Sequence, residues 1–143
     1  MTKVVPIQSG LFDFPSEEDD AAMPSPVSPD HGARQQALDV HQSFIVEAPA
    51  GSGKTGLLVQ RLLKLLADDS VEEPEQVLAI TFTRKATAEM RDRVLGHLES
   101  ARKNVSLEGT GEFDRQTRAL ADAVLQRDGE RGWSLLDQSD RLH

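Results

Sequence analysis

A chain of 143 residues suits one modest folded domain, and its 38% hydrophobic and 28% charged residues are ordinary for a globular protein. It has no cysteine, which excludes disulfides and thiolate metal sites, and no apolar run near the roughly 20 residues that a membrane helix requires. The net charge of −8 argues against a polyanion partner, yet residues 84–103 carry six basic against three acidic side chains. We expect a cytoplasmic protein without a membrane anchor.

The first 32 residues are predicted to be a disordered, acidic and proline-rich leader. They carry one lysine against six Asp and Glu, and residues 12–32 contain four prolines and few large apolar side chains. Such a segment cannot bury enough apolar surface to offset the entropy of ordering it. The folded domain is therefore expected over residues 33–143.

Two short strands are predicted within this domain. Residues 33–40 suit a short helix, whereas 43–48 and 77–82 are β-branched and aromatic runs that are typical of buried strands. A small-residue loop, 48–55, follows the first strand. An acidic connector, 68–76, precedes the second.

A leucine-rich helix is predicted between the two strands, after the loop. Its apolar face is predicted to hold Leu58, Leu62, Leu65 and Leu66. Its polar face is predicted to hold Gln60, Arg61 and Lys64.

Two further helices are predicted after the second strand. Apolar residues that recur every four positions predict an amphipathic helix of about 15 to 20 residues, with an inner face of Ala86, Met90, Val94 and Leu98. A last helix is predicted from Phe113 to a stop at Asp128 and Gly129. The order strand, loop, helix, strand, helix, helix is typical of an α/β fold with parallel strands and a right-handed connection.

The loop between the first strand and its helix has the pattern of a phosphate cradle. The stretch APAGSGKT, residues 48–55, matches GxxxxGK[ST] at its last three positions, with Ala48 in place of the first glycine. Gly51 and Gly53 allow the backbone to curl, so that its N–H groups face an anion together with the positive end of the following helix.

Each polar group of the loop has an expected role. Lys54 would place its ammonium on the β- and γ-phosphates of ATP, and the hydroxyl of Thr55 would ligate Mg²⁺. The backbone N–H donors around the phosphates would come from Ala50, Gly51, Ser52 and Gly53. The loop therefore predicts ATP and Mg²⁺ as cofactors.

Three stretches together resemble the opening motifs of the UvrD/RecB/AddA group of superfamily 1 DNA helicases. They are RQQALD (34–39), FIVEAPAGSGKT (44–55) and VLAITFTRKATAEMRDRV (77–94). The third is the most specific, because it is similar to this group's motif Ia, and Ala at the first loop position is also usual there. The resemblance implies a partial RecA-like P-loop NTPase domain and an ATP-driven translocase on single-stranded DNA.

The resemblance also implies roles for individual residues. Gln35 or Gln36 would be the adenine-reading glutamine of the Q motif. In motif Ia, Phe82 offers a stacking face, and Arg84 and Lys85 offer phosphate contacts that do not depend on base sequence. The expected DNA-binding residues are Thr81, Phe82, Thr83, Arg84 and Lys85.

An ATPase also needs a second acidic motif, an Asp or Asp-Glu at the end of a hydrophobic strand, to hold the Mg²⁺ shell and polarise water, and neither residues 134–140 nor residues 65–69 fit it. Glu47, before the loop, and Glu89, on the helix of motif Ia, are interpreted as structural or surface acids. We therefore assign no catalytic residue. We expect an N-terminal fragment of a helicase that binds ATP and single-stranded DNA without hydrolysing ATP alone, partnered by the remaining helicase chain or a RecB/AddA-type complex. Its uncovered strands are expected to make it aggregation-prone. A small P-loop kinase and a non-catalytic nucleotide-binding regulatory domain are the alternatives.

Overall fold

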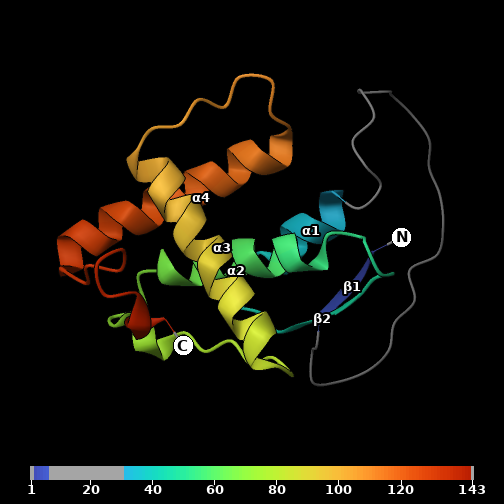
Figure 1. Cartoon of the computed structure of the whole chain (residues 1–143). Helices are drawn as coiled ribbons and strands as arrows, with labels where there is room; N and C mark the ends of the chain where they lie inside the picture. The colour runs from blue at the N-terminus through green and yellow to red at the C-terminus, as the bar shows by residue number, and fades with distance from the viewer. Residues whose placement is uncertain (1, 7–30, 143) are drawn as a thin grey trace. The chain divides into compact units, whose positions relative to one another are not determined.

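The computed structural model describes residues 2–6 and 31–142. The chain divides into two compact units, 1–54 and 55–143, and each is described by itself. The described residues form two strands, four α-helices and two short 3-10 helices, so this part of the chain is mixed α and β (Figure 1). None of the described helices is both long and apolar enough to cross a lipid bilayer.

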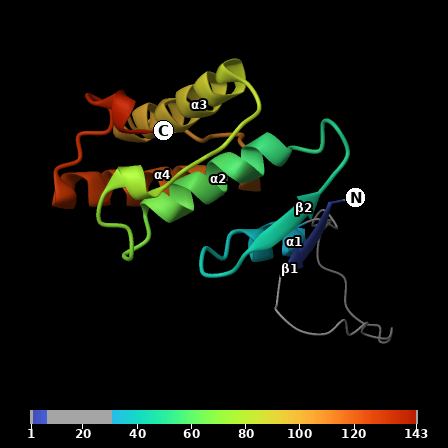
Figure 2. The same ribbon diagram turned by 90° about the horizontal axis from the view of Figure 1, so that it is seen from below.

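The first unit holds a pair of antiparallel strands and one short helix. Strand β1 (Lys3–Pro6) pairs with strand β2 (Phe44–Glu47), with Lys3 opposite Glu47. Helix α1 (His31–Ala37) lies beside β1 (Figure 2). Valine and isoleucine dominate the middle of both strands and favour extended backbone, and opposite charges at the facing ends support this register.

This unit differs from the sequence-based expectation in three respects. The strand Lys3–Pro6 lies where the sequence predicts a disordered leader, while residues 7–30 of that leader lie outside the described residues. The described sheet is antiparallel, whereas parallel strands are expected. Strand β2 forms where predicted but is not buried, since Ile45 is 54% exposed. These differences have one reason, which is that β2 pairs with a strand near the N-terminus of the chain. Strand propensity does not predict such a long-range contact.

The second unit is helical and contains the main hydrophobic core. Its helices are α2 (Lys54–Leu66), whose first residue belongs to the first unit, α3 (Arg84–Arg102) and α4 (Glu112–Arg131). Helix α3 crosses both α2 and α4 (Figure 1). The core is built from Val59, Leu63, Leu66, Val71, Val77, Val94, Leu98, Ala101, Ala121, Val124, Trp133 and Leu135.

The buried face of α2 agrees with the predicted leucine face only in part. Leu66 is buried and Leu62 and Leu65 pack against the core, as predicted. Leu58 and Gln60 are not where predicted. Leu58 is 48% exposed, whereas Gln60 is 1% exposed. Leucines surround much of this helix, so their spacing alone does not select a face. The amide of Gln60 donates to Thr117 Oγ1 at 2.9 Å and to the carbonyl of Phe113 at 3.3 Å, both on α4. A buried amide that is hydrogen-bonded escapes most of the penalty of burial, which makes this face acceptable.

Helix α3 confirms the predicted stripe, because Val94 and Leu98 are buried in the core. Its N-terminus is capped by Thr83, whose hydroxyl accepts the N–H of Ala86 at 3.1 Å.

Helix α4 ends three residues later than predicted. Gly129 lies inside the helix, and the left-handed residue that ends it is Gly132, with φ of 67°. The N–H of Gly132 donates to the carbonyl of Asp128 at 2.8 Å. Glycine adopts this backbone conformation without steric cost. Either glycine meets that requirement, so composition alone could not choose between them.

Two arginines near the C-terminus anchor the acidic connector 68–76. Arg127 on α4 is 6% exposed and donates to the carboxylate of Asp69 at 2.9 Å. Arg141 bonds to two glutamates of the connector at 2.6 and 2.7 Å. The connector is therefore held by charge-assisted hydrogen bonds, which are stronger than neutral ones.

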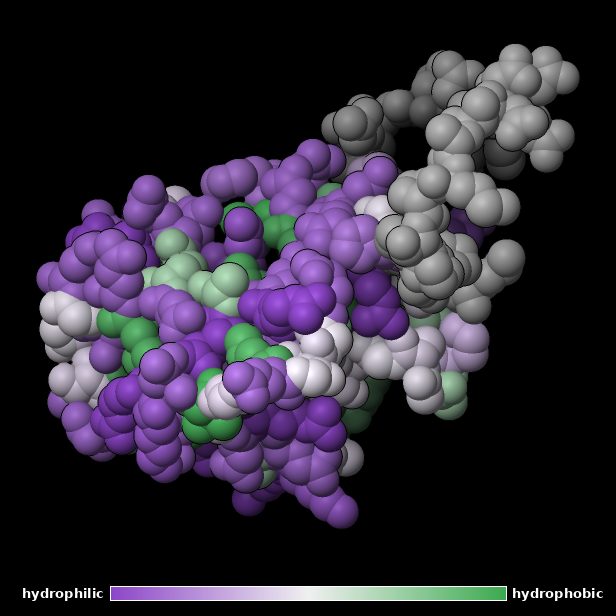
Figure 3. All heavy atoms as spheres, turned by 90° about the horizontal axis from the view of Figure 1, so that it is seen from above, coloured by the Kyte–Doolittle hydropathy of each residue, from purple (hydrophilic) through white to green (hydrophobic). Residues whose placement is uncertain are grey.

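Several large apolar side chains are exposed in the described part of the chain. They are Val5, Ile45, Leu58, Leu78, Ile80, Phe82, Val105 and Phe113. On the face in Figure 3, hydrophobic residues form separate patches within a mainly hydrophilic surface. Isolated apolar residues on a surface are common, so only a run of them is informative.

Such a run occurs in the extended segment 77–82, which the sequence predicts as a buried strand. Val77 is 9% exposed, but Leu78, Ile80 and Phe82 are 67%, 86% and 108% exposed. Alternation of this kind is typical of a strand with one packed face and one open face. The segment pairs with no strand among the described residues, so it is extended without belonging to a sheet.

The open face of this segment leads to a prediction about self-association. We expect Ile80→Lys to lower aggregation in concentrated protein, because the segment combines high β propensity with no charge and no proline. The free energy of unfolding should change by less than about 0.5 kcal/mol, since the side chain makes few contacts. Light scattering and urea denaturation measure the two effects. Unchanged aggregation of the lysine variant would show that another surface is responsible.

Candidate functional site

The loop after β2 adopts the curled backbone that a phosphate cradle requires. The N–H of Ser52 donates to the carbonyl of Pro49 at 3.2 Å, which closes a turn. Gly51 and Gly53 have φ of 79° and 83°, and residues with side chains rarely adopt these values. Helix α2 begins at the next residue, Lys54.

The side chain of Lys54 reaches back across this loop. Its ammonium donates to the carbonyl of Ala48 and, at 3.4 Å, to the carbonyl of Pro49, while the side chain stays exposed. The positive charge is thereby held at the open side of the turn without a carboxylate partner in the described part of the chain. An anion entering the loop would meet this charge directly.

Ser52, Ala50 and Thr55 are the remaining loop residues that the sequence predicts to take part in nucleotide binding. The hydroxyl oxygen of Ser52 is buried and has no hydrogen-bond partner in the described structure, which is unusual for a buried polar atom. Ala50 and Thr55 are exposed, Thr55 as the second residue of α2. Among the described residues, no group of three or more His, Cys, Asp or Glu side chains is arranged to hold a metal ion.

The side chains of the two glutamines expected to read adenine form no hydrogen bond to the loop within the described structure. Gln35 and Gln36 both lie on α1 with exposed side chains. The residue before them, Arg34, does reach the loop, and its guanidinium donates to the carbonyl of Ser52 at 2.5 Å. Sequence reasoning missed Arg34 because only the course of the chain from α1 through β2 brings it there.

The residues expected to bind DNA divide into two groups. Thr81 and Thr83 use their hydroxyls locally: Thr83 caps α3, and Thr81 Oγ1 lies 2.6 Å from Thr87 Oγ1. Phe82, Arg84 and Lys85 form an exposed cluster at the start of α3.

The charges of this cluster are available to an anion. Lys85 lies 3.9 Å from Glu89, in a pair whose side chains are 86% and 59% exposed. Solvent weakens such a pair to less than about 1 kcal/mol. Arg84 forms no ion pair among the described residues. Positive charges in the first turn of a helix also oppose its dipole, so an anionic ligand there would relieve an unfavourable interaction.

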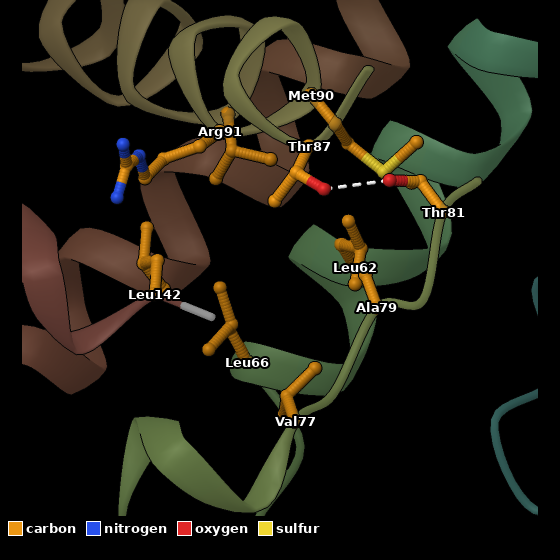
Figure 4. A pocket seen from close by; sticks show the side chains of 10 residues that line it. Leu62, Leu66, Val77, Ala79, Thr81, Thr87, Met90, Arg91 and Leu142 are labelled. Carbon is orange, nitrogen blue, oxygen red and sulfur yellow. Dashed lines mark hydrogen bonds between the residues drawn. The ribbon is translucent and has the colours of Figure 1, made fainter. Parts of the chain in front are cut away.

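An apolar pocket lies behind the extended segment, within the second unit (Figure 4). Leu62 and Leu66 of α2 face Val77 and Ala79 of the segment across it, and Met90 of α3 closes one side. The hydrogen bond between the hydroxyls of Thr81 and Thr87 ties the end of the segment to α3. This hydrogen bond holds the end of the segment just before the exposed cluster, and the pocket is lined mostly by apolar side chains.

Residues 30–141 match the family model described as the UvrD/REP helicase N-terminal domain. Similar proteins include an ATP-dependent helicase/nuclease subunit of Desulfitobacterium hafniense, which is 42% identical over 62% of this chain and 6% of its own length. The protein of the same name from Clostridium novyi is 43% identical over 43% of this chain and 5% of its own. The ATP-dependent DNA helicase UvrD1 of Mycobacterium tuberculosis is 43% identical over 54% of this chain and 11% of its own.

The matched region is a small part of these relatives, between 5% and 11% of their length. No solved structure matches this chain. The match to the family model covers the loop, the extended segment and α3, the regions that carry the resemblance found in the sequence.

Proposed function

Because the chain belongs to the UvrD/REP helicase N-terminal domain family, we propose that it binds Mg²⁺-ATP and single-stranded DNA as the first module of an ATP-dependent DNA helicase. The observation that carries this proposal is the loop 48–55, with glycines at φ of 79° and 83° leading directly into α2. A partial RecA-like fold over residues 33–143 is part of the proposal.

The nucleotide would be held mainly through its phosphates. The backbone N–H groups from Ala50 to Gly53 would donate to them, and the ammonium of Lys54 would leave its two carbonyl partners to contact the terminal phosphates. The buried hydroxyl of Ser52 offers one more donor or acceptor. ATP would supply the free energy of its hydrolysis, and Mg²⁺, held by Thr55, would neutralise part of its charge.

We expect this chain to bind ATP without turning it over on its own. Hydrolysis requires a carboxylate that holds the Mg²⁺ shell and orients the attacking water. Of the two acidic stretches that follow leucines, 65–69 lies at the end of helix α2 and 134–140 belongs to no strand. DNA-stimulated release of phosphate by the purified chain would contradict this part of the proposal.

Single-stranded DNA would bind at the start of α3. Phe82 is 108% exposed, so its whole ring is available to stack on a base. Arg84 and Lys85 lie directly after it and would contact the backbone phosphates. The hydroxyls of Thr81 and Thr83 form local hydrogen bonds. These two residues would therefore contribute to DNA binding by holding the backbone before α3 in place.

We predict that Phe82→Ala weakens binding of an oligothymidine about 10-fold, because stacking of one base contributes about 1 to 3 kcal/mol. Arg84→Gln should weaken binding by a smaller factor and reduce its dependence on salt, since one phosphate contact is lost. Fluorescence anisotropy at several salt concentrations measures both effects.

Arg102→Gln is the matched control for this experiment. Arg102 is exposed on the last turn of the same helix, so its replacement removes the same charge far from the cluster. Equal losses in the Arg84 and Arg102 variants would show that only the overall charge of α3 attracts DNA.

Assembly with other chains is part of the proposal as well. Two of the relatives named above are themselves described as subunits. We therefore propose that this chain also assembles with further helicase chains, in the cytoplasm.

A further inference from the structure

Arg34 brings a second positive charge to the loop 48–55. It lies half-buried on α1, and its Nη2 donates to the carbonyl of Ser52 at 2.5 Å. The planar end of the same guanidinium covers Gly53, where a Cβ atom would lie 3.2 Å from Nη2 and 3.4 Å from Nη1. All three residues belong to the first compact unit.

Most of the hydrogen-bonding capacity of this guanidinium is not used within the described structure. Arginine has five N–H donors in a planar fork. The described structure gives the side chain of Arg34 one hydrogen bond and no ion pair. A half-buried cation with spare donors attracts an anion, because a charge-assisted hydrogen bond is stronger than a neutral one.

Lys54 and Arg34 approach the loop in the same manner. The ammonium of Lys54 bonds to the carbonyls of Ala48 and Pro49, and the guanidinium of Arg34 bonds to the carbonyl of Ser52. Pro49 and Ser52 are the two ends of one turn. Loop carbonyls therefore hold two cations, one at each end of this turn. Each cation is in a position to leave its neutral carbonyl acceptor and bind a negatively charged acceptor, which is the stronger one.

We propose that Arg34 is a second cationic ligand for the phosphate chain of the bound nucleotide, acting beside Lys54. This inference rests on nucleotide binding at the loop, as proposed above. Phosphate is the part of the nucleotide that fits, because Arg34 contacts Ser52 and Gly53, the residues next to the start of α2. The planar fork of an arginine also matches two phosphate oxygens at once.

The test compares Mg²⁺-ATP, ADP, AMP and inorganic tripolyphosphate as ligands of the full chain, measured by calorimetry. Arg34→Gln should weaken ATP and tripolyphosphate binding about 10-fold and AMP binding by less than about 3-fold, since the lost contact is to phosphate. Arg34→Lys keeps the charge and should restore part of the affinity. Lys3→Gln, which removes an exposed charge from the same unit, should leave all four affinities unchanged.

Two results would overturn the inference while leaving nucleotide binding intact. In one, Arg34→Gln binds every ligand as the unchanged chain does. In the other, all four affinities fall by the same factor, which is the result expected of a side chain that only holds the loop in shape. Failure of the unchanged chain to bind ATP would overturn the proposed nucleotide site and this inference together. Circular dichroism melts of each variant confirm that the compared proteins are folded.

Discussion

Lys54→Ala is expected to weaken Mg²⁺-ATP binding by roughly 10- to 150-fold, measured by calorimetry. A hydrogen bond between two charged groups contributes about 1.5 to 3 kcal/mol, and the ammonium is the strongest single donor that the loop offers. The fold should not change, because the side chain is exposed and bonds only to two loop carbonyls.

Lys64→Ala provides the matched control for this result. Lys64 lies on the same helix with an exposed side chain, so its replacement removes an equal charge ten residues away. We expect the affinity of this variant for ATP to stay within about 2-fold of the original, since exposed charges are screened at this distance. Retained ATP binding in Lys54→Ala would remove the basis of the nucleotide site proposed for loop 48–55.

Trp133→Ala is expected to lower the free energy of unfolding by about 3 to 5 kcal/mol, the range for truncation of a large buried side chain. Trp133 is 1% exposed and is the largest fully buried side chain of the described core. Its indole N–H donates to the carbonyl of Glu72 at 3.0 Å, and the guanidinium carbon of Arg127 lies 5.8 Å from its ring centroid. Removal would open a cavity and also delete one of the hydrogen bonds that hold the acidic connector.

Urea denaturation followed by circular dichroism measures this loss without depending on the fluorescence of the single tryptophan. Trp133→Phe keeps most of the ring and loses one hydrogen bond, so a smaller loss of about 1 to 2 kcal/mol is expected. Val105→Ala, at a position 51% exposed, should change stability by less than about 0.5 kcal/mol. Equal stability of the Trp133→Ala variant and the original would mean that the core is not organised around this side chain.

The parts of the candidate site that depend on residues adjacent in the chain could be predicted from the sequence. The glycines at 51 and 53 and the helix beginning at Lys54 follow from a pattern of adjacent residues, and the structure has the positive φ values that this pattern requires. The stripe through Val94 and Leu98 was also sufficient to place the inner face of α3. Arg34 could not be found in this way, because its contact with Ser52 joins residues 18 positions apart.

What the sequence determined by itself is the family, the phosphate-loop pattern and the positions of the long helices, because each depends on residues close together in the chain. Only the tertiary structure decided that Gln60 rather than Leu58 is buried on α2, that β2 pairs with Lys3–Pro6, and that residues 77–82 have an open apolar face. These outcomes depend on which distant groups supply hydrogen bonds and cover apolar surface. Propensity and periodicity describe a segment's preferences, whereas its partners decide which preference is realised.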